Sequence, residues 1–511
     1  MRPMRILEQV FIKAMASSPL SFGCLLQRHC IFTLQAVCLF ITSNQAAAQQ
    51  YPPNQQPVIQ HLERIKKQTG IGAVSYALVE GNTIVATGGI GEYGLDNKRP
   101  VTEASLFRVG SITKTFTSLA VMHLVEQGDL QLDQVVKSVV PDIPLHNPWP
   151  KTPVNLAMLL EHTAGLQDLT REELDYPEPL SLKAAFNIKP EAKQLRWRPG
   201  YHYSYTNLGA GYVGRIIETV TGEDYDSWFE REILAALSMH DSQLRWTEKL
   251  EQSLVSGYDA DLTTKIPYWH TLFRPFGGLN TTARDMAKFL LLFTDESVPN
   301  ESMPKNNIVS VSALKRMETA ETTLAAKAGL NTGYGLGIRS TYFNGHRIYG
   351  HGGDGDGYLA EFAYSKESHR AYFVVINAFR HDILDDFTGL LNNWLVEELP
   401  ETKEVASQQP IKPLSLEQLL EITGEYQEVT TRFPFHTNAQ PEIILIKNIN
   451  NDIFKCLPNT NTNECTKLLP VTEVLFRTEE VPHASMAFVK APDSNLYLQA
   501  GFGNYQKLNS H

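Results

Sequence analysis

The chain has 511 residues, of which 42% are hydrophobic, and a formal net charge of −11 at pH 7. That length exceeds one ordinary domain and supplies enough apolar surface for a sizeable core. The acidic balance argues against nucleic-acid binding and against a basic patch that would hold a membrane surface.

The N-terminal segment has the pattern of a targeting signal. Arg28 precedes an apolar run from Ile31 to Ile41, and Ala46-Ala47-Ala48 supplies small residues for cleavage. We therefore expect residues 1–48 to be a signal peptide and the mature chain to be periplasmic or secreted. The apolar run is too short for a stable membrane anchor.

A strand hairpin over residues 74–79 and 83–86 is predicted next, followed by a long apolar helix that ends at Gly128, a typical C′ glycine. The helix opens with Ser111-Ile112-Thr113-Lys114. Three residues is close to one helical turn, so the hydroxyl and the amine share a face. Because a desolvated lysine can take a proton from serine, we predict Ser111 as a nucleophile and Lys114 as its proton acceptor.

The Ser-x-x-Lys pattern occurs twice more, at Ser302–Lys305 and Ser312–Lys315. Pro304 disfavours a helical conformation at the residue before it. The second match is predicted to open a surface helix with Ser310 as its N-cap. These contexts make both spare matches poor candidates for a nucleophile.

A mostly helical stretch is expected over residues 129–269. It contains Tyr205-Thr206-Asn207 on a loop that runs into a helix rich in small residues. A tyrosine can act as a base when a nearby cation stabilises its phenolate, and Lys114 could supply that charge. The other Tyr-x-Asn match, at 342–344, is interpreted as structural because Asn344-Gly345 is a type I′ hairpin signal. A purely structural role for Tyr205 and Asn207 in bracing a turn is the alternative.

Strands return over residues 333–338, 347–349, 359–363 and 372–377, and His351-Gly352-Gly353 follows the second of them. The glycines remove side chains where a substrate backbone would lie against the strand edge, so Gly353 is a predicted substrate-binding position. His351 could donate to a substrate carboxylate or to Tyr205. The backbone N–H groups of Ser111 and Asp354 could form an oxyanion hole. The alternative for His351 is a hydrogen-bonded structural residue.

The last part of the chain is predicted to be a separate module. A closing helix over residues 385–398 is followed by a polar linker at 401–413. After a short helix near 415–423, alternating segments predict a small β-rich domain within 414–511, of barrel type. Its role, whether covering a cleft, binding cell-wall polymer or assisting assembly, stays open.

Cys456 and Cys465 are the only cysteines outside the predicted leader. Pairing them closes a loop of about ten residues, worth roughly 2.5–3 kcal/mol on the chain-entropy model. An oxidising compartment would allow this disulfide, and two unpaired thiols in a reduced compartment are the alternative.

With these motifs in this order, the chain resembles the serine penicillin-recognising hydrolases, the group of class C β-lactamases, D-alanyl-D-alanine carboxypeptidases, D-aminopeptidases and related esterases. The resemblance covers roughly residues 55 to 400 and is strengthened by the segments 159–166 and 275–283. It implies an acylated Ser111, proton transfer by Lys114 and Tyr205, and a contact from Asn207 to the substrate amide. His351 stands where many β-lactamases of this family carry lysine, which lowers the expectation of a dedicated β-lactamase.

The expected fold is α+β, a β-lactamase-like antiparallel sheet flanked by helices with a helical lobe, within residues 49–400. The expected function is an exported serine hydrolase cleaving a D-amino-acid peptide, as in a carboxypeptidase, or an ester. A class C-type β-lactamase and a non-turnover penicillin-binding sensor or scaffold are the alternatives. No Gly-x-Ser-x-Gly elbow supports an unrelated α/β-hydrolase. No metal or organic cofactor is implied, and peptidoglycan is a candidate partner.

Overall fold

The computed structural model describes residues 56–174, 176, 178–294, 308–400, 409–430, 441–460 and 464–508. The predicted signal peptide and the spare match Ser302–Lys305 lie outside the described residues, as does most of the predicted linker. We refer to residues 56–400 as the main domain and to residues 409–508 as the barrel. None of the helices in these described ranges combines the length and apolarity that crossing a membrane requires.

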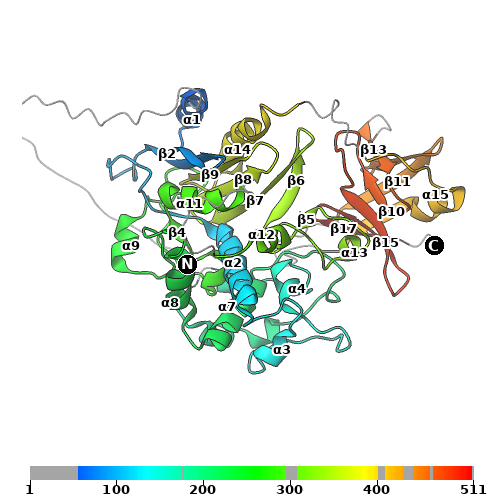
Figure 1. The fold of residues 1–511 in the computed structure, drawn as a ribbon, viewed down its shortest axis with the longest axis horizontal. Coiled ribbons are helices and arrows are strands. Elements are labelled where there is room, and N and C mark those ends of the chain that lie inside the picture. The colour runs from blue at the N-terminus through cyan, green and yellow to red at the C-terminus, as the bar shows by residue number, and fades with distance from the viewer. Residues whose placement is uncertain are drawn as a thin grey trace, which may run out of the picture. The chain divides into compact units, whose positions relative to one another are not determined.

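A seven-stranded antiparallel sheet organises the main domain, in the order β2-β1-β9-β8-β7-β6-β5 (Figure 1). The first hairpin is therefore joined to strands that follow almost three hundred residues later, through the pairing of β1 with β9. This arrangement confirms the α+β prediction. The strands are β1 Ala73–Glu80, β2 Thr83–Gly91, β5 Gly333–Tyr334, β6 Arg339–Phe343, β7 His346–Gly355, β8 Tyr358–Ser365 and β9 Arg370–Ile376.

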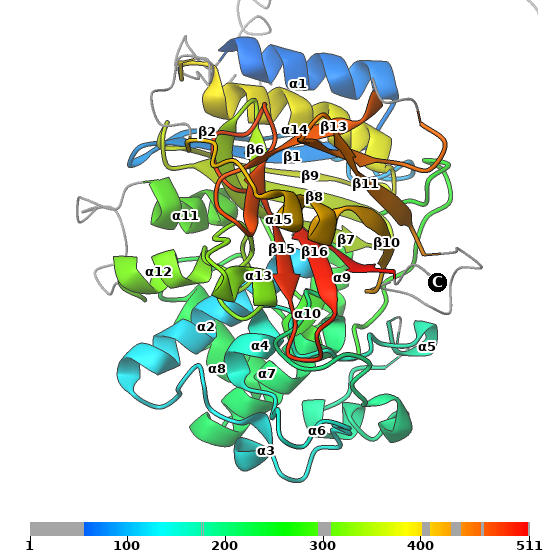
Figure 2. The same cartoon turned by 90° about the vertical axis from the view of Figure 1, so that its right-hand side faces the viewer.

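Helices cover both faces of this sheet because its central strands carry apolar side chains on each of the two faces. In β1, Val74, Tyr76 and Leu78 pack with α1 (Gln56–Thr69) and α14 (His381–Val396). The intervening residues Ala73, Ala77 and Val79 join the core that contains α11 (Ala283–Thr294) and α2 (Thr113–Gln127). Figure 2 shows α1 and α14 above the sheet, and α11 with the helical lobe below it.

The helical lobe is built from two long helices, α2 and α7 (Asn207–Thr221), and several short ones. α2 is buried on almost every side and ends at Gly128, which has φ of 85° as predicted for a C′ glycine. A 3₁₀ turn, η1 (Gly110–Ile112), precedes it. The remaining elements are α3 Val136–Val139, α4 Leu156–Leu160, α5 Arg171–Leu174, α6 Leu182–Ala185, η2 Pro190–Ala192, α8 Tyr225–Phe229, η3 Glu230–Leu234, α9 Glu248–Ser253, α10 Arg274–Gly277, α12 Val311–Met317, α13 Leu324–Lys327, and the paired strands β3 Phe107–Arg108 and β4 Asn280–Thr281.

Two local predictions about the spare motifs are confirmed. Asn344 and Gly345 have φ of 48° and 79° and form the two-residue turn between β6 and β7. Ser310 caps α12 by accepting a hydrogen bond from the Ala313 N–H. Ser312 and Lys315 therefore lie in the first turns of α12, a different helix from the one that carries Lys114.

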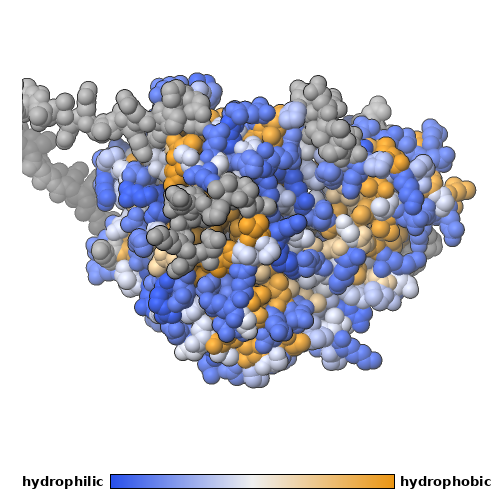
Figure 3. All heavy atoms as spheres, viewed as in Figure 1, coloured by the Kyte–Doolittle hydropathy of each residue, from blue (hydrophilic) through white to orange (hydrophobic). Residues whose placement is uncertain are grey.

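The C-terminal module is a closed eight-stranded barrel, as predicted from its alternating segments. Its core contains Tyr426, Ile444, Phe476, Phe488 and Leu498, and a helix, α15 (Leu416–Ile422), packs on that core. The strands are β10 Gly424–Glu428, β11 Ile443–Ile449, β12 Asp452–Cys456, β13 Thr466–Pro470, β14 Leu475–Arg477, β15 Met486–Lys490, β16 Leu496–Ala500 and β17 Gly503–Lys507. The face seen in Figure 3 mixes hydrophilic and apolar side chains on both the barrel and the main domain.

The structure contains the Cys456–Cys465 disulfide. It ties the end of β12 to the segment that enters β13, so it closes one connection of the barrel. The bond agrees with the prediction that these two cysteines pair.

The barrel packs on the segment that leads into Tyr205. The Gln499 amide donates to the Tyr201 carbonyl at 2.8 Å and to His202 Nδ1 at 3.2 Å, and its oxygen accepts from the Ala325 N–H at 2.7 Å. Asn504 donates to the Tyr203 carbonyl at 2.7 Å. The barrel therefore contacts Tyr201, His202 and Tyr203, the three residues that lead to the predicted site residues Tyr205 and Asn207.

We expect this contact to weaken in acid. Burial lowers the pKa of His202 to about 4 from an ordinary value of 6.5. The unfolded chain binds the proton first, so this residue's contribution to stability is complete above pH 6.5 and is lost as the pH falls towards 4, by about 3 kcal/mol in total. Urea denaturation at pH 7.5 and pH 4.5 measures it.

His202→Asn keeps a hydrogen-bond acceptor but does not titrate, so it is the matched control for this pH effect. We expect the variant to lose less stability than the wild type over the same pH interval. Equal losses in the two proteins would assign the acid sensitivity to other groups.

Candidate active site

Ser111 lies in the η1 turn, immediately before α2 and against the end of β7. Gly110 has φ of 48°, and a Cβ atom there would lie 2.4 Å from the Asp354 carbonyl oxygen. Only glycine allows the two backbone segments to approach this closely. The fold therefore holds Ser111 beside the backbone of Asp354.

Lys114 is buried one helical turn further along, with 3% of its surface exposed. Its Nζ donates to Asn207 Oδ1 at 2.8 Å and to the Phe276 carbonyl at 3.0 Å, and it lies within hydrogen-bonding distance, 2.9 Å, of Ser111 Oγ. A neutral lysine keeps two N–H bonds and one lone pair. The Asn207 and Phe276 oxygens can accept from those two N–H bonds, which leaves the lone pair of the amine for the Ser111 hydroxyl.

Tyr205 and Asn207 reach the same place from the start of α7. Thr206 caps this helix, and Asn207 is its first residue. The Tyr205 ring centre lies 4.9 Å from Lys114 Nζ and 4.2 Å from the ring centre of His162. The structure thus brings together the four residues predicted from two distant motifs, Ser111, Lys114, Tyr205 and Asn207.

Asp168 holds the start of α7 and was missed in the sequence. Its carboxylate accepts from the Asn207 N–H at 2.6 Å and from the Thr206 hydroxyl at 3.2 Å. A buried carboxylate at a helix N-terminus is favoured by the free N–H groups and by the helix dipole. Asp168 therefore fixes the position of Asn207, whose side-chain oxygen accepts one of the Lys114 hydrogen bonds.

We expect Asp168→Ala to lower kcat by roughly 10- to 100-fold, because a small displacement of Asn207 misplaces Lys114. Stability should fall by about 1–3 kcal/mol through the lost hydrogen bonds. Asp168→Asn keeps an acceptor oxygen and should recover most of kcat, and KM should rise in Asp168→Ala, because Asn207 also places the substrate, but stay near the wild-type value in Asp168→Asn. Steady-state kinetics with thermal unfolding gives all three quantities.

Ser181→Ala is the matched control, since Ser181 caps α6 and is not among the residues that line the cleft. It should cost about 1 kcal/mol of stability and leave kcat unchanged. An Asp168→Ala variant that loses stability but keeps kcat would show that Asp168 has no positioning role.

His351 lies in β7 and is almost fully buried. Its Nε2 lies 2.6 Å from Tyr334 Oη, and its Nδ1 lies 2.5 Å from the Gly352 carbonyl oxygen. The Tyr205 ring is 6.3 Å away between ring centres. Tyr334, which the sequence did not single out, is therefore the neighbour that orients the imidazole.

A backbone contact that the sequence did not reveal requires glycine at position 353. A Cβ atom at this residue would lie 1.9 Å from the Val109 carbonyl oxygen, so β7 can contact the segment carrying Ser111 only at a glycine. Close backbone packing therefore requires a glycine at this position, and Gly353 is not among the residues that line the cavity of about 600 Å³ described below.

Beyond Gly350, β7 keeps only one strand partner. β6 pairs with β7 up to Gly350, whereas β8 pairs with it as far as Gly355. No described strand pairs with the other edge of residues 351–355. An extended substrate could add to this edge by backbone hydrogen bonds, and the Asp354 N–H belongs to it.

Of the site residues, Ser111, Tyr205, Asn207, His351 and Asp354 line a cavity of about 600 Å³ whose walls come from the sheet, the helical lobe and the barrel. Its lining includes the carboxylates of Asp354, Asp356 and Glu428. The one lining guanidinium, Arg339, is already paired with Glu361. Within the described residues, the cleft therefore carries more negative than positive charge.

A serine hydroxyl hydrogen-bonded to a buried lysine, in a cleft between an antiparallel sheet and a helical lobe, defines a serine hydrolase. The chain belongs to the beta-lactamase family, since the family model described as Beta-lactamase matches residues 58–388.

Among characterised relatives, penicillin-binding protein 4 of Amycolatopsis lactamdurans is 28% identical over 273 residues, which are 52% of this chain and 69% of the relative. Other curated relatives are matched over about half their length, 48%. An octameric penicillin-binding protein homologue from Pyrococcus abyssi has a TM-score of 0.57 at 22% identity, covering 88% of this chain and 99% of its own. A beta-lactamase/D-alanine carboxypeptidase from Yersinia pestis has a TM-score of 0.54 at 20% identity, covering 67% and 98%. At these identities the two structures establish the fold.

Proposed function

We propose that this chain is an exported serine hydrolase that cleaves an amide or ester bond through an acyl-enzyme on Ser111. The observation that carries the proposal is the 2.9 Å contact between Lys114 Nζ and Ser111 Oγ, with the lysine held by two further acceptors. Export rests on the predicted signal peptide, and the disulfide is compatible with an oxidising compartment.

In the proposed mechanism, Ser111 Oγ attacks the substrate carbonyl carbon while its proton passes to neutral Lys114. The backbone N–H groups of Ser111 and Asp354 stabilise the oxyanion. Lys114 and Tyr205 then deliver the proton to the departing amine or alkoxide as the scissile bond breaks. Water hydrolyses the resulting ester by the same route in reverse, and Asn207 and His351 place the substrate.

The substrate classes that we propose are D-amino-acid peptides and small esters. The structural neighbour from Yersinia pestis is described as a beta-lactamase/D-alanine carboxypeptidase, which supports the first class by analogy. The cleft carboxylates favour substrates that present a neutral or positively charged end where these side chains line the cavity. A terminal carboxylate in that position would meet Asp354, Asp356 and Glu428.

A β-lactamase is the second candidate, favoured by the family model and by the name of the structural neighbour. A penicillin-binding sensor that acylates without turnover is the third. These candidates differ in which acyl-enzyme forms and in whether water releases it.

The proposal is tested with the mature chain and four substrates: a p-nitrophenyl ester, a D-alanyl anilide with a free amine, a D-Ala-D-Ala peptide and a chromogenic cephalosporin. We expect kcat/KM for the ester or the anilide to exceed that for the carboxylate-terminated peptide by about tenfold or more. Glu428→Gln should narrow this difference, whereas Glu425→Gln, on the exposed side of the same strand, should not.

Preferential turnover of the cephalosporin would identify a β-lactamase instead. Covalent labelling by penicillin without turnover of any substrate would identify a sensor.

A further inference from the structure

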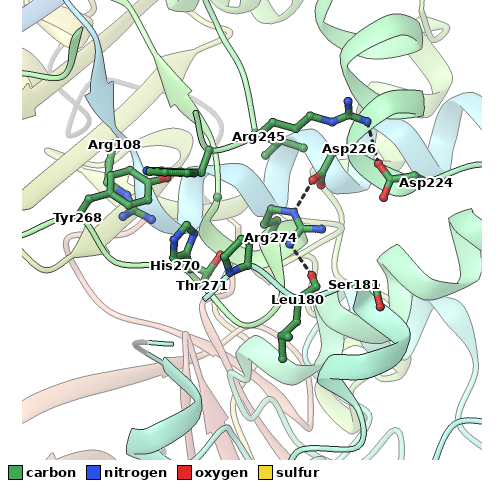
Figure 4. A pocket seen from close by; sticks show the side chains of 14 residues that line it. Arg108, Leu180, Ser181, Asp224, Asp226, Arg245, Tyr268, His270, Thr271 and Arg274 are labelled. Atoms are coloured by element: carbon green, nitrogen blue, oxygen red, sulfur yellow. Dashed lines mark hydrogen bonds and ion pairs between the residues drawn. The ribbon is translucent and has the colours of Figure 1, made fainter. Parts of the chain in front are cut away.

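A second pocket, of about 390 Å³, lies behind one wall of the catalytic cleft. The segment 268–271 separates the two. Trp269 lines the cleft, whereas Tyr268, His270 and Thr271 line the second pocket. Figure 4 shows Asp226, Arg245, His270 and Arg274 gathered around the same space.

Aromatic rings form one side of this pocket. Trp246 is 38% exposed, and its ring centre lies 5.5 Å from that of His270 and 6.2 Å from that of Tyr268. Burial, reinforced by nearby Arg108, lowers the pKa of His270, so this ring is neutral at pH 7. The three rings offer an apolar surface with polar edges.

Charged groups of both signs form the other side. Arg274 pairs with Asp226 and donates to the Leu180 carbonyl at 2.9 Å, and Arg245 pairs with Asp224 at 3.1 Å (Figure 4). With Arg108, the lining holds three guanidinium groups and two carboxylates. A strongly charged ligand of either sign would therefore face like charge within the pocket.

Two lining residues also carry buried polar atoms without a hydrogen-bond partner among the described residues: Thr271 Oγ1 and Asp226 Oδ1. Thr271 is 3% exposed and Asp226 is 5% exposed. A hydroxyl hydrogen needs an acceptor and a carboxylate oxygen needs a donor, and an unmet buried group costs about 1–3 kcal/mol. One ligand satisfies both needs if it donates and accepts without carrying charge.

We propose that this pocket binds a neutral hydroxylated ring, a pyranose sugar. Each sugar hydroxyl both donates and accepts, so neighbouring hydroxyls match the Asp–Arg pairs and the two unpartnered oxygens. The C–H face of the ring packs on the aromatic side. The volume accommodates one or two sugar units.

The pocket shares structure with the active site. Arg274 begins α10, whose Phe276 carbonyl accepts from Lys114. The Arg108 guanidinium lies 3.9 Å from the centre of the Trp269 ring, with Arg108 only three residues before Ser111. The sugar can be a free ligand that alters the site or a part of the substrate, and the experiment separates these sources.

The test is binding of glucose, N-acetylglucosamine and its β-1,4 disaccharide to the full mature chain, by saturation-transfer NMR and tryptophan fluorescence. Inorganic phosphate and methylammonium are the charged comparison probes. We expect saturable sugar binding that is at least about tenfold tighter than that of either charged probe.

Trp246→Ala and Arg245→Ala should each weaken sugar binding by about tenfold or more while hydrolysis of a small ester without sugar stays unchanged. Arg231→Ala is the matched control, because Arg231 forms a similarly exposed pair with Glu223 and does not line the pocket. It should bind sugar like the wild type.

A sugar that changes kcat/KM for the small ester is a free ligand acting on the site. A sugar that binds without such a change supports attachment to the substrate, with a glycosylated ester cleaved faster than the bare ester. Absence of saturable sugar binding, tighter binding of a charged probe, or binding that survives both substitutions would overturn the proposal.

Discussion

Ser111→Ala is expected to abolish covalent labelling by a fluorophosphonate and by a fluorescent penicillin, and to lower kcat for any ester or amide substrate on the order of 10⁴- to 10⁶-fold. The reason is that the variant lacks the hydroxyl that contacts Lys114 Nζ and is proposed to form the acyl-enzyme, while binding contacts and the oxyanion donors remain. Because the alanine fits the same turn, the melting temperature should change little. Gel fluorescence, intact mass and steady-state kinetics measure these effects.

Ser312→Ala is the matched control for this loss. Ser312 belongs to another Ser-x-x-Lys sequence, but it lies on α12, where it contacts Ser310 and does not line the cleft. Labelling and kcat should both be unchanged in this variant. Labelling that persisted in Ser111→Ala would remove the proposed nucleophile, whatever the control showed.

The central pair was predictable because its geometry is local. Ser111 in the 3₁₀ turn η1 and Lys114 in α2 are three residues apart along one helical stretch, so their contact follows from the helical repeat. The Asn344-Gly345 turn and the Gly128 helix end were predictable for the same reason, since each depends on one glycine and its neighbours.

The partners that complete the site come from distant segments, so local sequence patterns could not predict them. Asp168, Phe276 and Tyr334 contact Asn207, Lys114 and His351 across 39, 162 and 17 residues of sequence. One of these partners is only a backbone carbonyl, which has no sequence signal. The contribution of Glu428 and Phe502 to the cleft likewise depends on how the barrel packs.

Strand lengths differed from the predictions where glycines meet neighbouring backbone. The expected strand 333–338 ends at Tyr334, because Gly337 has φ of 71° and a Cβ atom at Gly335 would lie 2.2 Å from the Met317 carbonyl oxygen. β7 is longer than the expected 347–349, since its glycine-rich end continues to pair with β8. Glycines thus end β5 but allow β7 to continue in close packing. Only the tertiary contacts distinguish these two effects.

Lys114→Arg is expected to lower kcat/KM by about 10²- to 10⁴-fold although the side chain can still donate hydrogen bonds. A guanidinium does not release its proton near neutral pH, so it cannot accept the proton of Ser111. Lys114→Met should lose activity to a similar or greater extent, because it also leaves the Asn207 and Phe276 oxygens without their donor. Rates of acylation by a penicillin and by an ester, followed in single-turnover experiments, measure the loss.

The comparison with Tyr205→Phe decides which of the two groups takes the serine proton. If Lys114 is the acceptor, Tyr205→Phe should slow acylation less than Lys114→Arg, because the phenol then assists only proton delivery to the leaving group. Lys315→Met, in the other described Ser-x-x-Lys sequence, should acylate like the wild type. Near-normal acylation by Lys114→Arg with a large loss in Tyr205→Phe would instead make Tyr205 the base, with Lys114, whose Nζ lies 4.9 Å from the centre of the tyrosine ring, as the cation that stabilises its phenolate.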